Sequence, residues 1–187
     1  MSDSRRAPFP FNPYDHLPEV PTFTLTSTDV SDGGTVPAVH TSGAFGVPGG
    51  EDRSPQLSWS GFPAETKSFA VTCYDPDAPT GSGFWHWAVA DIPASVTDLP
   101  AGAGTPGSAD LPASAVTLAN SAGFAGYVGS APPAGHGAHR YFFVVHAVDV
   151  ETLGLDAAAR PEILGFNLHF HTLARAYLVP TFEVPAA

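Results

Sequence analysis

The residues of this chain that are best suited to chemistry lie in two polar clusters, each next to an apolar segment. The first is Asp75-Pro76-Asp77-Ala78-Pro79, followed by His86 between two tryptophans. The second is the Gly- and Pro-rich stretch 129–138, which leads into His139-Arg140-Tyr141. Histidine and tyrosine offer N–H and O–H donors to an anion, and a carboxylate beside a histidine can orient its ring or act with it in acid/base chemistry.

Each cluster also has an ordinary explanation when it is taken alone. Aspartate and proline are common in turns, and a single histidine in a strand more often serves packing than ligand binding. However, two aspartates, two histidines and a tyrosine all lie at the ends of apolar segments. This coincidence favours a pocket over the separate explanations.

The segments that must position these residues are predicted to be strands. The chain has 19 glycines and 20 prolines, about a fifth of its length, which favours short strands joined by turns over a helical bundle. Alternation of apolar and polar residues, or short apolar runs, predicts strands at residues 23–27, 56–60, 68–74, 84–92, 141–150 and, interrupted at Pro180, 176–184. The same alternation predicts a buried core that contains Leu57, Trp59, Phe69, Val71, Val89, Phe143, Val145 and Ala147.

One segment near the C-terminus has helical periodicity. Ile163, Phe166, Phe170 and Leu173 recur at positions i, i+3, i+7 and i+10, after a proline that suits a first helical turn. We therefore expect a helix that packs through these four residues. The chain is predicted to be mostly β, with short C-terminal helices, as one domain over residues 21–187 that follows an irregular arm over residues 1–20.

The charge balance excludes two classes of partner. Seven basic residues face eighteen acidic ones, which gives a formal net charge of −11. Such a surface repels nucleic-acid phosphates and anionic lipid headgroups, so nucleic acid is not an expected partner. A bound anion must be held by a local site that acts against this field.

Cysteine usage and hydropathy bear on localisation. Cys73 is the single cysteine, which excludes an intramolecular disulfide and a thiolate zinc cluster. No run of about 18 apolar residues predicts a membrane span, and Arg5-Arg6 precedes three prolines rather than an apolar run. We expect a cytoplasmic protein without stable membrane insertion.

The two clusters together resemble the motifs of the phosphatidylethanolamine-binding protein family, also called Raf kinase inhibitor-like. The similar segments are Asp-Pro-Asp-Ala-Pro at 75–79, Trp-His-Trp at 85–87, and Gly-Ser-Ala-Pro-Pro to His-Arg-Tyr at 129–141. Residues 54–61 and 81–87 resemble its bacterial YbhB/YbcL branch, and the resemblance extends from about Phe23 to Phe182. It implies an antiparallel β-sandwich and a homodimer.

The resemblance also implies a pocket for a small anion, a phosphate or a phospholipid headgroup, with no cofactor and no metal. Its lining would be Asp75, Asp77, Pro79, Phe84, His86, Ala131, His139 and Tyr141. Ala131 departs from the eukaryotic pattern, which has glycine there, and its methyl group would narrow the pocket for bulky headgroups. We expect Asp75 to accept a hydrogen bond from His86 and so fix its tautomer, and Arg140 to face away and join loops.

Two other functions remain open at this stage. The chain could regulate a kinase or a protease through protein contacts. Alternatively, Asp75 with His86 and His139 could act as an acid/base enzyme, although no Gly-x-Ser-x-Gly motif is present and we expect no enzyme. The pairs His136/His139 and His169/His171 are weak metal signatures, since 169 and 171 point apart on a helix.

Overall fold

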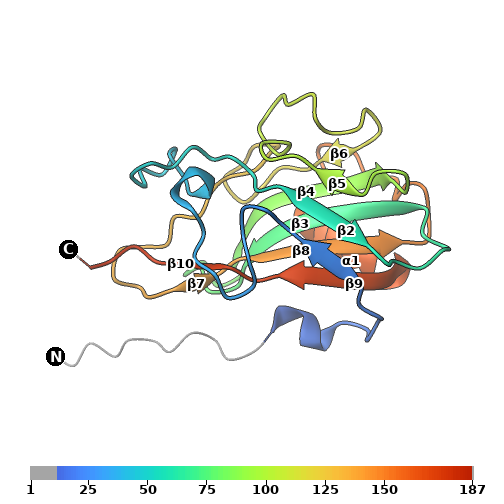
Figure 1. The fold of residues 1–187 in the computed structure, drawn as a ribbon, viewed down its shortest axis with the longest axis horizontal. Coiled ribbons are helices and arrows are strands. Elements are labelled where there is room, and N and C mark those ends of the chain that lie inside the picture. Colours follow the sequence, from blue (N-terminus) through green and yellow to red (C-terminus); the bar gives the residue numbers. More distant parts are fainter. Residues whose placement is uncertain (1–11, 187) are drawn as a thin grey trace.

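The computed structural model describes residues 12–186, which form two antiparallel sheets packed face to face (Figure 1). The larger sheet has the strand order β6-β4-β3-β8-β9. Its strands are β6 (Val116–Thr117), β4 (Phe84–Pro93), β3 (Ser68–Asp75), β8 (Phe142–Val148) and β9 (Thr172–Leu178). The smaller sheet contains β1 (Thr24–Thr26), β2 (Leu57–Ser60) and β5 (Asp98–Leu99), and a separate pair joins β7 (His139–Arg140) to β10 (Thr181–Phe182). The predicted mostly-β class is confirmed.

The core lies between the two sheets and contains the residues that the alternation predicted. Leu57 and Trp59 of β2 pack in the same cluster as Phe69 and Val71 of β3. All eight predicted core residues are at most 3 % exposed. The strand register is therefore the predicted one, because a shift by one residue would have turned these side chains outward.

The last predicted strand differs from the observed one in where it begins. β9 starts at Thr172, directly after the helix, rather than at residue 176, and Pro180 separates it from β10. Proline cannot donate a ladder hydrogen bond, which accounts for the break. The other long strands lie within a few residues of their predicted positions.

One α-helix, α1 (Pro161–His171), covers the outer face of the larger sheet, behind the sheet in Figure 1. The predicted packing face of this helix is wrong: Ile163, Phe166 and Phe170 are 50 %, 64 % and 63 % exposed. Leu173, the fourth predicted contact, belongs to β9.

The helix packs instead through Leu164 and Leu168, which contact a sheet surface made of Ala70, Ala88 and Ala90. Pro161, Leu164 and Leu168 form a second apolar stripe with the same helical spacing. The helix runs into β9 without a loop, so the start of β9 fixes which of the two stripes faces the sheet.

A short 3-10 helix, η1 (Pro13–His16), lies on the same outer face, below β9 in Figure 1. The Asn12 side chain caps it by accepting a hydrogen bond from the Tyr14 amide, and the Tyr14 ring stacks on Tyr177 of β9. Of the irregular arm expected over residues 1–20, residues 1–11 lie outside the described part of the chain. No helix among residues 12–186 is both long enough and apolar enough to cross a membrane.

Candidate functional site

A cavity of about 140 Å³ opens at the end of the larger sheet, where β3 ends and β4 begins. Asp75, the last residue of β3, pairs in the ladder with Phe84, the first residue of β4. Six of the eight residues selected from the sequence line this cavity: Asp75, Pro79, Phe84, His86, Ala131 and His139. Asp77 and Tyr141 are not among the lining residues.

Asp75 is buried, with 3 % of its surface exposed, and its two carboxylate oxygens have separate roles. Oδ1 accepts a hydrogen bond from the Asp77 amide at 2.8 Å, which closes the turn after β3. Oδ2 lies 2.7 Å from Nδ1 of His139. Asp75 therefore orients His139, and the expectation that it orients His86 is wrong.

The partner of Asp75 is decided by strand pairing rather than by distance along the chain. Tyr74 of β3 lies opposite Phe142 of β8 in the ladder. Antiparallel pairing then brings the residues that precede β8 next to the residue that follows Tyr74. His139 reaches Asp75 in this way although 64 positions separate them.

The hydrogen-bond partner of His86 lies on a neighbouring loop. Its Nδ1 lies 2.8 Å from the Val128 carbonyl oxygen, and a carbonyl only accepts, so Nδ1 carries a proton and Nε2 of the neutral ring holds a lone pair. Burial lowers the pKa of His86, and the nearby Asp75 offsets this only in part. The neutral ring is thus favoured.

His136 extends the chain of polar contacts, and the sequence reasoning missed this role. Its Nδ1 lies 2.7 Å from Nε2 of His139. Because Nδ1 of His139 donates to Asp75, Nε2 of a neutral His139 accepts, and His136 donates to it. The available signal was the spacing of His136 and His139, which we had weighed only as a metal motif.

Asp77 and Arg140 form a bidentate ion pair beside the cavity. The Arg140 Nε and Nη2 atoms each lie 2.8 Å from a carboxylate oxygen of Asp77, and the Arg140 amide donates to the same group at 3.0 Å. Burial alone would raise the pKa of Asp77, but these hydrogen bonds outweigh it and lower the pKa. Arg140 joins the turn after β3 to β7, as expected, and does not line the cavity.

Tyr141 supports the cavity from the core. It is buried, and its ring meets the ring of His86 edge-on with centroids 5.2 Å apart. Burial raises the pKa of Tyr141 well above its usual value, and Asp75 raises it further. The phenol therefore stays protonated, and its position restricts the tilt of the His86 ring.

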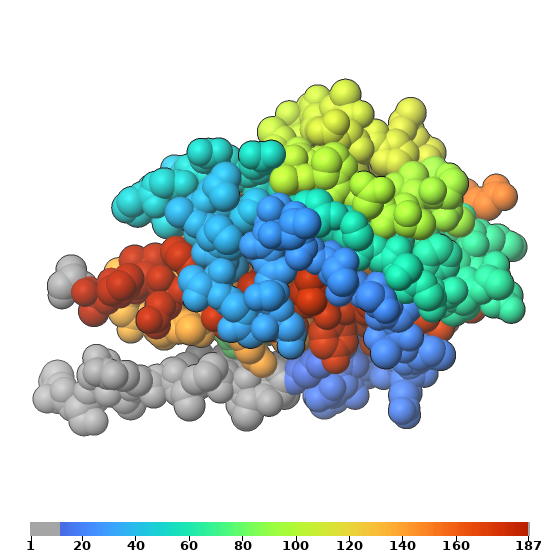
Figure 2. All heavy atoms as spheres, viewed as in Figure 1, coloured from blue at the N-terminus to red at the C-terminus, as the bar shows by residue number. Residues whose placement is uncertain are grey.

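The segment between β1 and β2 holds the second wall of the cavity, and it covers much of one face of the molecule, coloured blue to cyan in Figure 2. It contributes Phe45 to the lining. Its Ser42 amide donates to the Ser130 carbonyl at 3.0 Å, and Asp52 accepts from the Gly129 amide at 2.8 Å. A side chain at residue 129 would overlap the Thr41 backbone, so this contact requires glycine.

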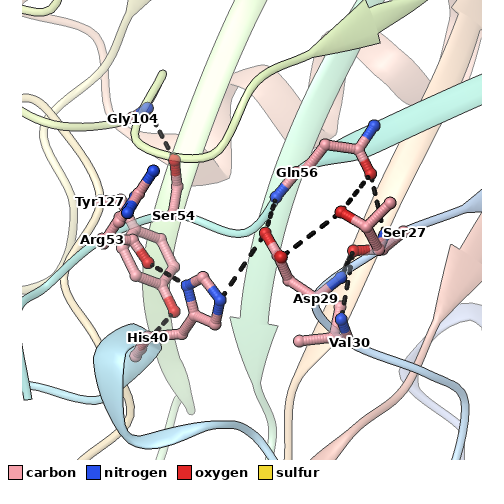
Figure 3. A network of polar contacts seen from close by, with 10 residues as sticks. Ser27, Asp29, Val30, His40, Arg53, Ser54, Gln56, Gly104 and Tyr127 are labelled. Atoms are coloured by element: carbon pink, nitrogen blue, oxygen red, sulfur yellow. Dashed lines mark hydrogen bonds and ion pairs between the residues drawn. The ribbon is translucent and has the colours of Figure 1, made fainter.

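A polar network anchors this wall to the rest of the protein (Figure 3). Nδ1 of His40 lies 2.7 Å from the Arg53 carbonyl oxygen, and Nε2 lies 3.7 Å from Asp29. The Tyr127 hydroxyl donates to the His40 carbonyl at 2.8 Å. His40 was not selected from the sequence, because no motif surrounds it.

The cavity has a carboxylate but no permanent cation. No lysine or arginine is among its lining residues in the described part of the chain. An anion placed here would face Nε2 of His86, which holds a lone pair in the neutral ring and becomes a donor only when the ring takes up a proton. Nε2 of His139 already accepts from His136, which is not among the lining residues. Contact of an anion with His86 would therefore require protonation of this ring.

The histidines near the C-terminus lie apart from this site. Nδ1 of His171 lies 2.8 Å from Asp149, whereas His169 is exposed and packs against Phe170. Among residues 12–186, no group of three or more His, Cys, Asp or Glu side chains is arranged to hold a metal ion.

Comparison with known proteins identifies the family and the fold of the chain. Residues 26–183 match the family model described as phosphatidylethanolamine-binding protein. The UPF0098 protein YbhB of Escherichia coli (strain K12) is 46 % identical over 159 residues, which covers 85 % of this chain and 99 % of YbhB. The crystal structure of E. coli YbcL, a member of the same family, superposes with a TM-score of 0.84 at 43 % identity and covers 87 % of this chain and 98 % of YbcL. The crystal structure of a homologue from Chlamydia trachomatis superposes with a TM-score of 0.72 at 31 % identity. The match covers 87 % of this chain and 97 % of the homologue's chain.

Proposed function

Because the chain belongs to the phosphatidylethanolamine-binding protein family, we propose that the cavity beside Asp75 and His86 binds a small phosphate-type anion, free or as a phospholipid headgroup. One observation carries the proposal. Two buried histidines, His86 and His139, line the cavity, and their Nδ1 atoms are held by the Val128 carbonyl and the Asp75 carboxylate, which fixes the orientation of both rings at its wall.

The size of the cavity limits the ligand. Its volume of about 140 Å³ is well below the roughly 300–1,000 Å³ of pockets for drug-sized molecules. A phosphoryl group with a short substituent fits this space, whereas the acyl chains of a lipid would remain outside it. Phe45 and Phe84 give the lining an apolar wall for such a substituent.

Protonation distinguishes two kinds of anion. Hydrogen phosphate carries an O–H group and can donate to a neutral histidine, whereas sulfate has only acceptors. Sulfate therefore binds only with proton uptake, and its affinity should rise as the pH falls from 8 towards the lowered pKa of His86. Hydrogen phosphate should bind with less proton uptake at the same pH.

Calorimetric titration with sulfate, phosphate and phosphoethanolamine tests the proposal. Titrations in buffers of different ionisation enthalpy give the number of protons taken up. We expect His139→Ala and His86→Ala each to weaken sulfate binding by about 1.5–3 kcal/mol, the range for hydrogen bonds to charged groups. His169→Ala, which alters an exposed histidine of α1, is the matched control. If both cavity variants bind sulfate as the unaltered protein does, the proposal is wrong.

One observation favours a second function, acid/base catalysis in the same cavity. The chain of contacts from Asp75 through His139 to His136 could pass a proton to a bound ligand. Incubation with a phosphate monoester that releases a coloured alcohol would separate the two functions. Turnover that is lost in His139→Ala would favour the enzyme, and binding without turnover would favour the carrier of a small anion.

A further inference from the structure

A second cavity, of about 230 Å³, lies on the outer face of the larger sheet between η1 and α1. The sheet side is formed by Thr72 of β3, His146 of β8 and Arg175 of β9. α1 contributes Leu168 and η1 contributes Tyr14 to the walls. The two cavities share no lining residue, so this is a separate place in the fold.

Arg175 is a buried cation without an acidic partner among residues 12–186. It is 9 % exposed, and its Nε atom is buried with no hydrogen-bond partner among residues 12–186. No aspartate or glutamate is among the lining residues of the cavity. Burying an unpaired charge is costly, and it is unexpected in a chain with a net charge of −11.

The neighbours of Arg175 do not neutralise it. Its guanidinium carbon lies 5.3 Å from the centroid of the Tyr14 ring, and this cation–π contact is not a hydrogen bond to an N–H donor. Asp15 and Glu19 line a wider hollow that Arg175 also borders, but both are exposed and neither forms an ion pair with it. The guanidinium therefore keeps its capacity to bind a carboxylate.

The other polar groups of the cavity are uncharged donors and acceptors. The buried hydroxyl groups of Tyr14 and Thr72 lie next to each other, and neither forms a hydrogen bond with any other group in the described part of the chain. Burial, together with the charge of Arg175, lowers the pKa of His146 to about 3, so this ring is neutral near pH 7. Among the described lining residues, Arg175 is thus the one side chain with a permanent charge, and the exposed imidazole of His169 lines the cavity as well.

We propose that this cavity binds a small monocarboxylic acid with an apolar body, whose carboxylate pairs with Arg175. A planar carboxylate matches two parallel N–H groups of a guanidinium. Trp85, Leu17 and Leu168 provide apolar walls for the rest of the molecule. A phosphate dianion fits less well, because one cation would have to neutralise two charges beside those apolar walls.

Gly165 of α1 offers a way to close this cavity alone. It lines the cavity, and a Cβ atom added to it meets no atom within 4 Å. A phenyl group at this position would fill the space that the apolar body needs, whereas a methyl group would leave most of it open. Gly165 does not line the wider hollow around Asp15 and Glu19, so the substitution separates the two spaces.

Titration with benzoate, followed by amide chemical shifts of the labelled full chain, tests the inference. Benzamide, which has the same shape without the charge, is the matched probe. We expect saturable benzoate binding with a dissociation constant of about 1 mM or lower, weakened roughly tenfold or more in Arg175→Met. Benzamide binding should change by less than about twofold in the same variant. Gly165→Phe should abolish benzoate binding, and Gly165→Ala should retain it.

Several outcomes would overturn the inference. Benzoate would fail to saturate, or it would bind equally well to Arg175→Met or to Gly165→Phe. Benzoate shifts centred on His86 and His139 would place the acid in the first cavity instead. Retained sulfate binding in Arg175→Met and Gly165→Phe would show that both variants are folded and that the two cavities act independently.

Discussion

The two cavities lie back to back across the same end of β3 and β4. Asp75, Phe84 and His86 line the first, whereas Tyr74 and Trp85, their neighbours on the same strands, line the second. Successive residues of a strand point to opposite faces of a sheet. Two short strand segments therefore supply both cavities with side chains of different chemistry.

The cavities differ in how they obtain positive charge. The first contains a carboxylate and two histidines but, in the described part of the chain, no permanent cation, so we expect its attraction for an anion to depend on pH. The second contains a guanidinium, which stays charged throughout the neutral range, and no carboxylate. We therefore expect the first cavity to bind an anion together with a proton, and the second cavity to bind an anion through its permanent cation.

The largest expected difference concerns the two arginines, Arg140 and Arg175. Arg140→Met would leave the buried Asp77 carboxylate without its cation, and we expect the free energy of unfolding to fall by about 2–3 kcal/mol. Arg175→Met removes a buried charge that has no acidic partner among residues 12–186, so we expect a change between zero and a gain of about 1 kcal/mol. Urea denaturation at pH 7 without added anions measures both.

A clear loss of stability in Arg175→Met would contradict this expectation. It would mean that the contact of Arg175 with the Tyr14 ring holds η1 against the sheet. The contrast between the two arginines would then disappear, and with it the main argument for a carboxylate ligand in the second cavity.

The second-largest expected effect is a dependence of the free energy of unfolding on pH that arises at His146. Burial holds the pKa of His146 at about 3 in the folded protein, whereas the unfolded ring takes up a proton near pH 6.5. Between these values only the unfolded chain is protonated, so the free energy of unfolding falls as the pH decreases, by about 1 kcal/mol per pH unit for this group.

We expect His146→Gln to lose less stability than the unaltered protein between pH 6.5 and pH 5, measured by urea denaturation at each pH. His169→Gln, at an exposed position on α1, is the matched control and should leave the slope unchanged. An equal slope in His146→Gln and in the unaltered protein would show that this ring is not kept neutral by burial.

Much of the fold and of the first cavity could be predicted because the decisive residues are local in the sequence. β3, β4 and β8 are apolar segments in which alternation sets the register, and Asp75 and His139 each lie at the end of such a segment. What the sequence did not predict is which side chains meet. Whether Asp75 bonds to His86 or His139 depends on the pairing of β3 with β8.

The packing face of α1 shows a second limit. Two apolar stripes have the same helical spacing, and periodicity alone cannot choose between Phe166 and Leu168 as the buried residue. The phenylalanines have the higher hydrophobicity, but the two leucines are the residues that cover the alanine surface of the sheet. The helix also continues directly into β9, which restricts how it can turn on that surface. The packing of α1 on the sheet, rather than the periodicity of its sequence, therefore determines which face is buried.

The second cavity could not be predicted at all. Its key residues, Tyr14, Thr72, His146, Gly165 and Arg175, come from five different elements, and each is surrounded by unremarkable sequence. That Arg175 has no acidic partner among residues 12–186 follows only from the positions of the carboxylates in the folded chain. Local motifs indicate sites built on one or two strand ends, and they give no sign of a site assembled across a sheet.

The smallest expected effect concerns Gly165, which lies in the middle of α1 beside the second cavity. Glycine within a helix costs about 0.5–1 kcal/mol relative to alanine, and an added Cβ meets no atom within 4 Å. We therefore expect Gly165→Ala to raise the free energy of unfolding by that amount in urea denaturation. Gly129→Ala is the contrasting control, since its side chain would overlap the Thr41 backbone and lower stability. A loss in Gly165→Ala would mean that the space beside α1 is filled, whereas a gain would mean that the edge of the cavity accommodates a methyl group, which is the condition for using Gly165→Ala as the control for Gly165→Phe.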